Sequence, residues 1–228
     1  MGPYNTPLAL SREPLTAAFF TFCAPLLFPV IAVALATALF AQGETLSTSA
    51  GWMVVCIGVG LQFLALTLWS EAIGAGPFAG RMVTTYHWVL IAIIAGPIML
   101  YGPMALIGAL MPQNEDWIFR EGMDPDVFTR ANWTISFMFY AIILAPVVEE
   151  VTYRGVAMGA ILSRGFGPVV AAVIASIAFT LPHIQYTNLA MLGVFITGLG
   201  FAALRVLSGT IIAPIIAHIS ANLISFIL

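Results

Sequence analysis

The sequence predicts an all-α fold, a polytopic membrane helix bundle of about seven transmembrane helices. Of its 228 residues, 61% are hydrophobic and only 7% are charged, and the mean hydropathy is +1.04. A soluble domain of this length cannot bury so much apolar surface. The apolar residues also gather into runs that approach or exceed the roughly 20 residues needed to cross about 30 Å of hydrocarbon.

The apolar runs place the expected helices in order along the chain. The last two runs are the shortest. The first run is too long for a cleavable signal peptide and lacks a small-residue cleavage site after it. Cys23 and Cys56 are expected at different depths, so we predict no disulfide between them. The predicted spans are 15–41, 52–75, 88–111, 133–163, 167–187, 189–204 and 209–227.

One polar segment divides the chain. Residues 112–132 are acidic and contain two prolines and a glycine, so we expect an extramembrane loop there. Residues 1–111 then hold the first three helices, and residues 133–228 hold the rest. In the first part Glu71 and His87 are the polar exceptions, and we expect no site chemistry before the loop.

The arginines indicate an orientation, because basic loops tend to stay in the cytoplasm. The chain has no lysine. With a cytoplasmic N-terminus, four arginines fall on the inner side, whereas the outer loop holds two arginines among five acidic residues. We therefore expect an integral protein of the bacterial inner membrane. A net charge of −3 without a basic cluster argues against nucleic-acid binding. The inner arginines are Arg12, Arg81, Arg164 and Arg205; the outer-loop residues are Arg120, Arg130, Glu115, Asp116, Glu121, Asp124 and Asp126.

Two adjacent glutamates and an arginine interrupt the apolar stretch AIILAPVVEEVTYRGVAMGAIL. An unpaired charge in such a segment costs several kcal/mol. Glu150 and Arg154 are four residues apart on one helix face and can pair, whereas Glu149 is turned by about 100°. Glu149 is therefore the freer carboxylate and the candidate general base.

Two later apolar segments each carry a histidine, in FTLPH (Phe179 to His183) and in HISAN (His218 to Asn222). A tight turn near residue 166 would place Glu149 and His183 at equal distances from it, roughly 25 Å along each helix. His218 is expected about a dozen residues into the last helix, some 16 Å deep, sharing a face with Asn222. We also expect prolines 182 and 214 to kink their helices.

Each element has a plainer interpretation. Glu150 with Arg154 alone is a helix ion pair, and His183 alone is an interhelical hydrogen bond. His218 and Asn222 could equally be polar residues that join neighbouring helices by hydrogen bonds. What favours a hydrolytic site is that all the candidate groups fall into three elements that can converge.

The three elements resemble the CAAX protease and bacteriocin-processing family, also called the Abi family, which includes the Ras-converting enzyme. EEVTYR has the form EExxxR, FTLPH the form FxxxH and HISAN the form HxxxN, in that order. The resemblance covers about residues 133–225. Enzymes of the Ras-converting type are usually described with eight helices, one more than we expect here.

The resemblance implies an intramembrane peptidase of glutamic type, without a cofactor, whose catalytic residues are Glu149, His183, His218 and Asn222. It implies that Glu149 activates a water together with His183, and that His218 and Asn222 steady the oxyanion. Glu150 and Arg154, with Phe179, would support the site. The implied partners are a membrane-anchored peptide or protein substrate and the lipid bilayer.

Three alternatives stay open at this point. The chain could be a non-catalytic scaffold or accessory subunit of a larger membrane complex that retains the family fold. A proton or metal-ion transporter is a further alternative, although transporters often show an inverted repeat, which this chain lacks. Two histidines with Glu149 could form a His₂Glu zinc site, but HExxH is absent, so we expect no metal.

Overall fold

The structure is a computed structural model that describes residues 6–40, 46–76, 81–111, 118 and 134–227. Within these residues the chain is helical and forms no strand. The predicted acidic loop 112–132 lies outside the described residues except for Ile118, and its arginines and acidic residues lie outside as well.

Seven helical spans are described, as the sequence predicts. Five are long and apolar enough to cross a membrane: Pro14–Phe40, Thr48–Ala72, Tyr86–Gly108, Ile135–Leu162 and Asn188–Ser208. Two shorter apolar helices, Pro168–His183 and Ile212–Ser225, complete the set. The sixth span is thus longer than predicted, and the short ones are the fifth and the seventh. At 1.5 Å per residue these two are about 24 Å and 21 Å long, less than the roughly 30 Å of a hydrocarbon core.

Several spans contain tighter or wider turns, so the helical elements outnumber the spans. In chain order they are η2 (Leu8–Arg12), α1 (Pro14–Ala18), η3 (Phe19–Cys23), α2 (Ala24–Phe40), α3 (Thr48–Ala72), α4 (Tyr86–Gly108), α5 (Ile135–Phe139), η6 (Tyr140–Leu144), α6 (Ala145–Glu150), η7 (Val151–Ala157), α7 (Met158–Leu162), α8 (Pro168–Thr180), η8 (Leu181–His183), α9 (Asn188–Ser208) and α10 (Ile212–Ser225).

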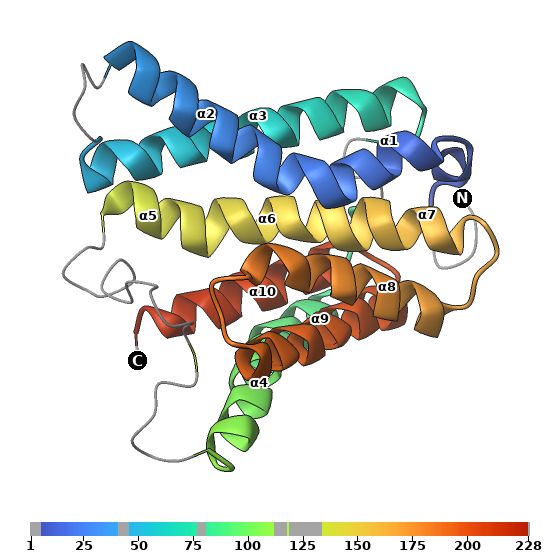
Figure 1. Cartoon of the computed structure of the whole chain (residues 1–228). Helices are drawn as coiled ribbons and strands as arrows, with labels where there is room; N and C mark the ends of the chain where they lie inside the picture. Colours follow the sequence, from blue (N-terminus) through green and yellow to red (C-terminus); the bar gives the residue numbers. More distant parts are fainter. Residues whose placement is uncertain (1–5, 41–45, 77–80, 112–117, 119–133, 228) are drawn as a thin grey trace.

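The span from α5 to α7 lies in the middle of the bundle (Figure 1). On one side α2 and α3 pack together, and α3 contacts α5, η6 and α6. On the other side α10 contacts α6 and η6, α8 contacts η7, and α4 and α9 close the group. Both halves of the chain therefore reach the glutamates of the central span.

Local chemistry fixes where the central helices begin and end. The Thr134 hydroxyl accepts a hydrogen bond from the Phe137 N–H at the start of α5, and the Thr187 hydroxyl does the same for Ala190 in α9. Gly165 adopts a positive φ of 87° in the predicted tight turn, and Pro168 opens α8. A helix start leaves N–H groups unbonded, so a proline there costs no hydrogen bond.

The last helix begins later than the sequence predicts. Gly209, with φ 64°, ends α9, and α10 starts only at Ile212. His218 is therefore six residues into α10 rather than a dozen. It still reaches the central span because α10 begins inside the bundle: the buried residues Thr210 and Ile211 both donate to the Arg81 carbonyl, at 2.8 and 3.1 Å.

The two prolines behave differently from the prediction. Pro214 lies in the first turn of α10, where its missing N–H has no helical partner to lose, so the predicted kink is wrong. Pro182 does more than kink its helix, because α8 ends at Thr180 and the chain continues as the short 3₁₀ turn η8. This turn carries His183.

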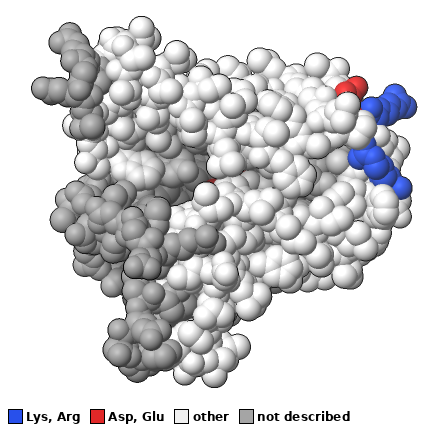
Figure 2. Space-filling view, viewed as in Figure 1, with Lys and Arg blue, Asp and Glu red and all other residues white. Residues whose placement is uncertain are grey.

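The antiparallel order of the seven spans puts the two chain ends at opposite ends of the bundle (Figure 1). The N-terminal end carries basic side chains on an otherwise mostly uncharged face (Figure 2). Arg164 there donates to the Ser11 carbonyl at 2.9 Å, next to Arg12 in η2. Arg205, predicted on the same side, is buried within α9. Cys23 and Cys56 are both free.

Candidate active site

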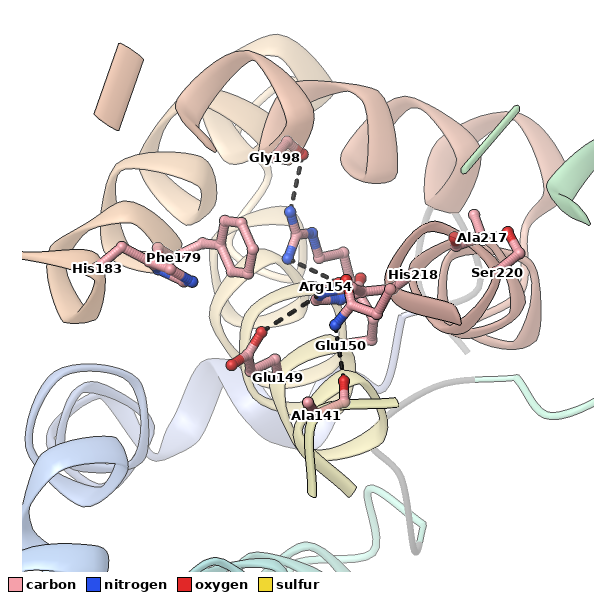
Figure 3. A network of polar contacts seen from close by, with 11 residues as sticks. Ala141, Glu149, Glu150, Arg154, Phe179, His183, Gly198, Ala217, His218 and Ser220 are labelled. Atoms are coloured by element: carbon pink, nitrogen blue, oxygen red, sulfur yellow. Dashed lines mark hydrogen bonds and ion pairs between the residues drawn. The ribbon is translucent and has the colours of Figure 1, made fainter. Parts of the chain in front are cut away.

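A buried ion pair forms the centre of the site. Arg154 Nη1 donates to Glu150 Oε1 at 3.0 Å, as the i,i+4 spacing predicts, and neither side chain is exposed. Arg154 Nη2 donates to the Gly198 carbonyl of α9 at 2.9 Å (Figure 3). Arg154 therefore ties the central span to α9 as well as neutralising Glu150.

His218 joins this pair from α10. Its Nδ1 lies 3.0 Å from the same Glu150 Oε1, and the histidine is nearly buried. A carboxylate at this distance favours the tautomer whose Nδ1 carries the proton. The other ring nitrogen, Nε2, then faces Glu149. Glu150 is thus an orienting group for His218, a contact between two helices that spacing within one helix does not predict.

Two phenylalanines pack against the imidazole of His218 and the guanidinium of Arg154. Phe201 of α9 stacks on His218 with ring centroids 4.8 Å apart, and Phe179 of α8 meets the same imidazole edge-on at 5.8 Å. The Arg154 guanidinium carbon lies 4.5 Å from the Phe179 centroid and 5.5 Å from that of Phe201. Cation–π contacts of this kind compensate part of the cost of burying a guanidinium.

Glu149 differs from its neighbour because it reaches open space. Its side chain is 26% exposed, and its Oε2 lies 3.8 Å from His218 Nε2. It lines a pocket of about 70 Å³ at the boundary between the central span and α2 and α3. One water needs roughly 10–15 Å³ by this kind of measure, so the pocket has room for several. Figure 2 shows an acidic side chain at the floor of a hollow on this uncharged face.

His183 stands apart from the ion pair. Its Nδ1 lies 2.9 Å from the Phe179 carbonyl, one turn earlier, and its ring packs on Phe179 with centroids 5.0 Å apart. Phe179 therefore lies between the two imidazoles, His183 on one side and His218 on the other (Figure 3). Within the described residues no hydrogen bond or ion pair joins His183 to Glu149, whereas His218 does approach it.

Asn222, one turn after His218 on α10, points to a different partner. Its Nδ2 donates to the Ala141 carbonyl at 2.8 Å. Ala141 belongs to the π-helical turn η6, whose wider winding changes which carbonyls are engaged within the helix. Asn222 therefore links α10 to the central span, close to the pocket-lining Tyr140.

In the part of the chain that the structure describes, no three histidine, cysteine, aspartate or glutamate side chains are arranged to hold a metal ion. The site is instead a chain of polar groups that runs from Arg154 through Glu150 and His218 to Glu149. Such a chain leaves one carboxylate next to open space and holds the other in a fixed network.

Some residues of the site carry no signal in the sequence. Phe201 and the Gly198 carbonyl belong to α9, which has no motif residue. The first half also takes part, contrary to our expectation: Gln62 and Val59 of α3 and Pro25 of α2 line the pocket of Glu149. Only the tertiary packing of α3 on the central span reveals this.

Comparison with known proteins agrees with the position of the site. Residues 131–224 match the family model described as type II CAAX prenyl endopeptidase Rce1-like. A protein of Escherichia coli, described as an uncharacterized 24.3 kDa protein, is 33% identical over 107 residues. The match covers 46% of this chain and 46% of that protein, about half the length of each. No solved structure matches the chain.

Proposed function

We propose, from the match of residues 131–224 to the family model described as type II CAAX prenyl endopeptidase Rce1-like, that this integral membrane protein hydrolyses a peptide bond with a water activated by Glu149. The family is a protease family. The observation that carries the mechanism is the contrast between the two glutamates: Glu150 is bonded twice and fully buried, whereas Glu149 faces the pocket of about 70 Å³.

The reaction needs one base and one oxyanion donor. The Glu149 carboxylate takes a proton from a water in the pocket, and the water oxygen bonds to the carbonyl carbon of the substrate. The carbonyl oxygen becomes an oxyanion. When the C–N bond breaks, protonated Glu149 gives its proton to the leaving nitrogen. The products are a carboxylic acid, which carries the OH from water, and a free amine, and Glu149 returns to its carboxylate form.

His218 is the proposed oxyanion donor, because its Nδ1 is held by Glu150 and its Nε2 lies 3.8 Å from Glu149 Oε2. Nε2 donates only when both ring nitrogens carry a proton, so the proposal requires the imidazolium, whose charge the two carboxylates offset. One preorganised donor of this kind is worth about 10²–10³ in kcat. Asn222 would assist by fixing α10 through the Ala141 carbonyl. His183 would act with Glu149 on the water once substrate occupies the pocket.

The mechanism we propose uses no metal ion. We expect purified, active protein to contain much less than one zinc per chain by elemental analysis, and to keep its activity in a strong chelator. One zinc per chain, with activity lost on chelation and restored by zinc, would overturn this part of the proposal.

The substrate class follows from where the site lies. Glu149 is near the middle of the 28-residue span Ile135–Leu162, about 20 Å from either end. This position supports a membrane-anchored peptide or protein as the substrate, and the CAAX tail named by the family description is one such class. We place the protein in the bacterial inner membrane with a cytoplasmic N-terminus, from the arginine distribution.

A comparison of cell membranes tests the proposal without a known substrate. Cells making the natural protein, Glu149→Gln or Glu71→Gln are compared by quantitative mass spectrometry of membrane peptides. Glu71 is the matched control, since it is an exposed carboxylate of α3 that undergoes the same chemical change. We expect cleavage products that appear with the natural protein and with Glu71→Gln and disappear with Glu149→Gln.

The same experiment distinguishes the non-catalytic scaffold. In that case the three strains would show the same membrane peptides, and the protein would co-purify with a large partner complex whether or not Glu149 is intact. Identical peptide sets from all three strains would therefore contradict the enzyme and favour the scaffold.

A further inference from the structure

The pocket that Glu149 lines has a polar residue on one wall that belongs to none of the three sequence motifs. Gln62 of α3 lines it and is only 2% exposed. Its side-chain amide makes no hydrogen bond to any described residue, although buried glutamine amides normally do. The remaining neighbours on this wall, Val59 and Pro25, are apolar. Because the amide borders the open pocket, it is available to bond a molecule that enters there.

Two residues on the opposite wall also carry polar groups. The hydroxyls of Thr152 and Tyr153 are buried and have no hydrogen-bond partner among the described residues, and both residues line the same pocket. Their helix, η7, begins directly after Glu150. Unsatisfied polar groups thus flank Glu149 on two sides, from α3 and from the central span.

A peptide segment that enters this pocket requires hydrogen-bond partners for its backbone. A bond can be cleaved only where the substrate chain is unwound, and its backbone N–H and C=O groups then lose their helical partners. Inside a membrane no bulk water is present to bond these backbone groups, so the protein must supply their hydrogen-bond partners. A glutamine amide offers two donors and one acceptor and can bond a backbone N–H and C=O together.

We propose that Gln62 is a substrate-positioning residue whose amide hydrogen-bonds the unwound backbone of the substrate beside the bond that Glu149 hydrolyses. The inference rests on the proposed function and adds to it a role for the first half of the chain. It also explains why α3 presents an amide, rather than another apolar residue, to the pocket.

The test uses a synthetic peptide that spans a bond whose cleavage in membranes depends on Glu149. Its kcat and KM are measured with the purified protein in bilayers for the natural protein, Gln62→Met and Thr67→Val. Methionine keeps the length and apolar stem of glutamine but lacks its amide. Thr67 is the control, because it lies on the same helix, its hydroxyl donates to the Phe63 carbonyl, and it is not among the residues that line the pocket.

We expect Gln62→Met to lower kcat/KM about tenfold, the size of one or two neutral hydrogen bonds, mainly through KM. Its melting temperature should stay the same or rise, because no bond within the protein is lost. A series of peptides in which one amide near the cleaved bond is replaced by an ester then locates the contact. With one ester peptide, Gln62→Met should cause little further loss, because the pair is already broken.

Three results would overturn the inference. Gln62→Met could leave kcat/KM within twofold of the natural value, or it could lower kcat alone, as a water-holding residue would. It could also lose activity equally with every ester peptide and in proportion to folded protein, as a purely structural residue would. If instead no peptide depends on Glu149 in membranes, the proposed function itself fails, and this inference with it.

Discussion

The two glutamates face different surroundings although they are consecutive in the chain. Glu150 shares its Oε1 with Arg154 and His218 at 3.0 Å each, and no atom of its side chain reaches solvent. Among the described residues Glu149 forms one ion pair, with His218 at 3.8 Å, and it is partly exposed. One carboxylate can therefore hold the site in place while the other remains available to take a proton.

Removing Arg154 should damage folding before it damages chemistry. Arg154→Ala leaves Glu150 as a buried charge with only His218 beside it, and breaking a buried pair costs about 3–5 kcal/mol. We expect a strongly reduced yield of folded protein and loss of activity together, measured by thermal unfolding in detergent. Arg164→Ala is the control, since Arg164 is exposed and bonds only backbone carbonyls; an equal loss of stability in both variants would contradict this role.

At the level of elements, two π-helical segments flank Glu149 and Glu150. Glu149 and Glu150 end the short α6, with η6 before it and η7 after it. Such wide turns occur frequently at functional sites, because they redirect side chains and carbonyls. Here η6 presents the Ala141 carbonyl to Asn222, and η7 carries Arg154.

Asn222→Ala tests the link between α10 and η6. The variant loses the 2.8 Å bond to the Ala141 carbonyl and releases α10, which carries His218. We expect activity to fall by up to 10²–10³-fold, near the cost of an oxyanion donor, and the η6 amides to exchange hydrogen faster. Ser220→Ala, which changes a neighbouring α10 hydroxyl, should leave both unchanged. Unchanged exchange in the Asn222 variant would show that the bond does not hold the helix.

The sequence predicted the elements better than the contacts. Hydropathy located all seven spans within a few residues, because membrane helices need long apolar runs. The i,i+4 rule gave the Glu150–Arg154 pair. Spacing within one helix does not predict the contact between His218 and Glu150, because that contact depends on where α10 enters the bundle. Nor does it predict the position of Gln62, which depends on how α3 packs. The roles of the catalytic residues stay predictions.

Over the whole molecule, the site lies where the two halves of the chain meet. The central span has α2 and α3 on one side and α8, α9 and α10 on the other (Figure 1). The ion pair faces α9 and α10, and the pocket faces α2 and α3. The division of the chain at residues 112–132 therefore stays a prediction about sequence segments, and the site uses residues from both sides of it.

Cysteine labelling tests the orientation of the bundle. Thr48 and Phe166 are exposed residues at opposite ends, at the start of α3 and in the turn before α8. In a background without Cys23 and Cys56, a cysteine at Thr48 should react with a membrane-impermeant reagent in intact cells. A cysteine at Phe166 should react only after the membrane is opened. Reaction of both cysteines in intact cells would contradict the seven-span arrangement, and the reverse pattern would contradict the cytoplasmic N-terminus.

The measurement that tests the central claim most directly is hydrolysis by purified protein in ¹⁸O-labelled water. The natural protein and Glu149→Gln are reconstituted in bilayers with a peptide that the natural protein cleaves, and the new carboxyl group is analysed by mass spectrometry. We predict one ¹⁸O in that carboxyl group with the natural protein, and no product with Glu149→Gln, although the variant melts at the same temperature. Product formed by Glu149→Gln at the natural rate would contradict glutamate-activated hydrolysis.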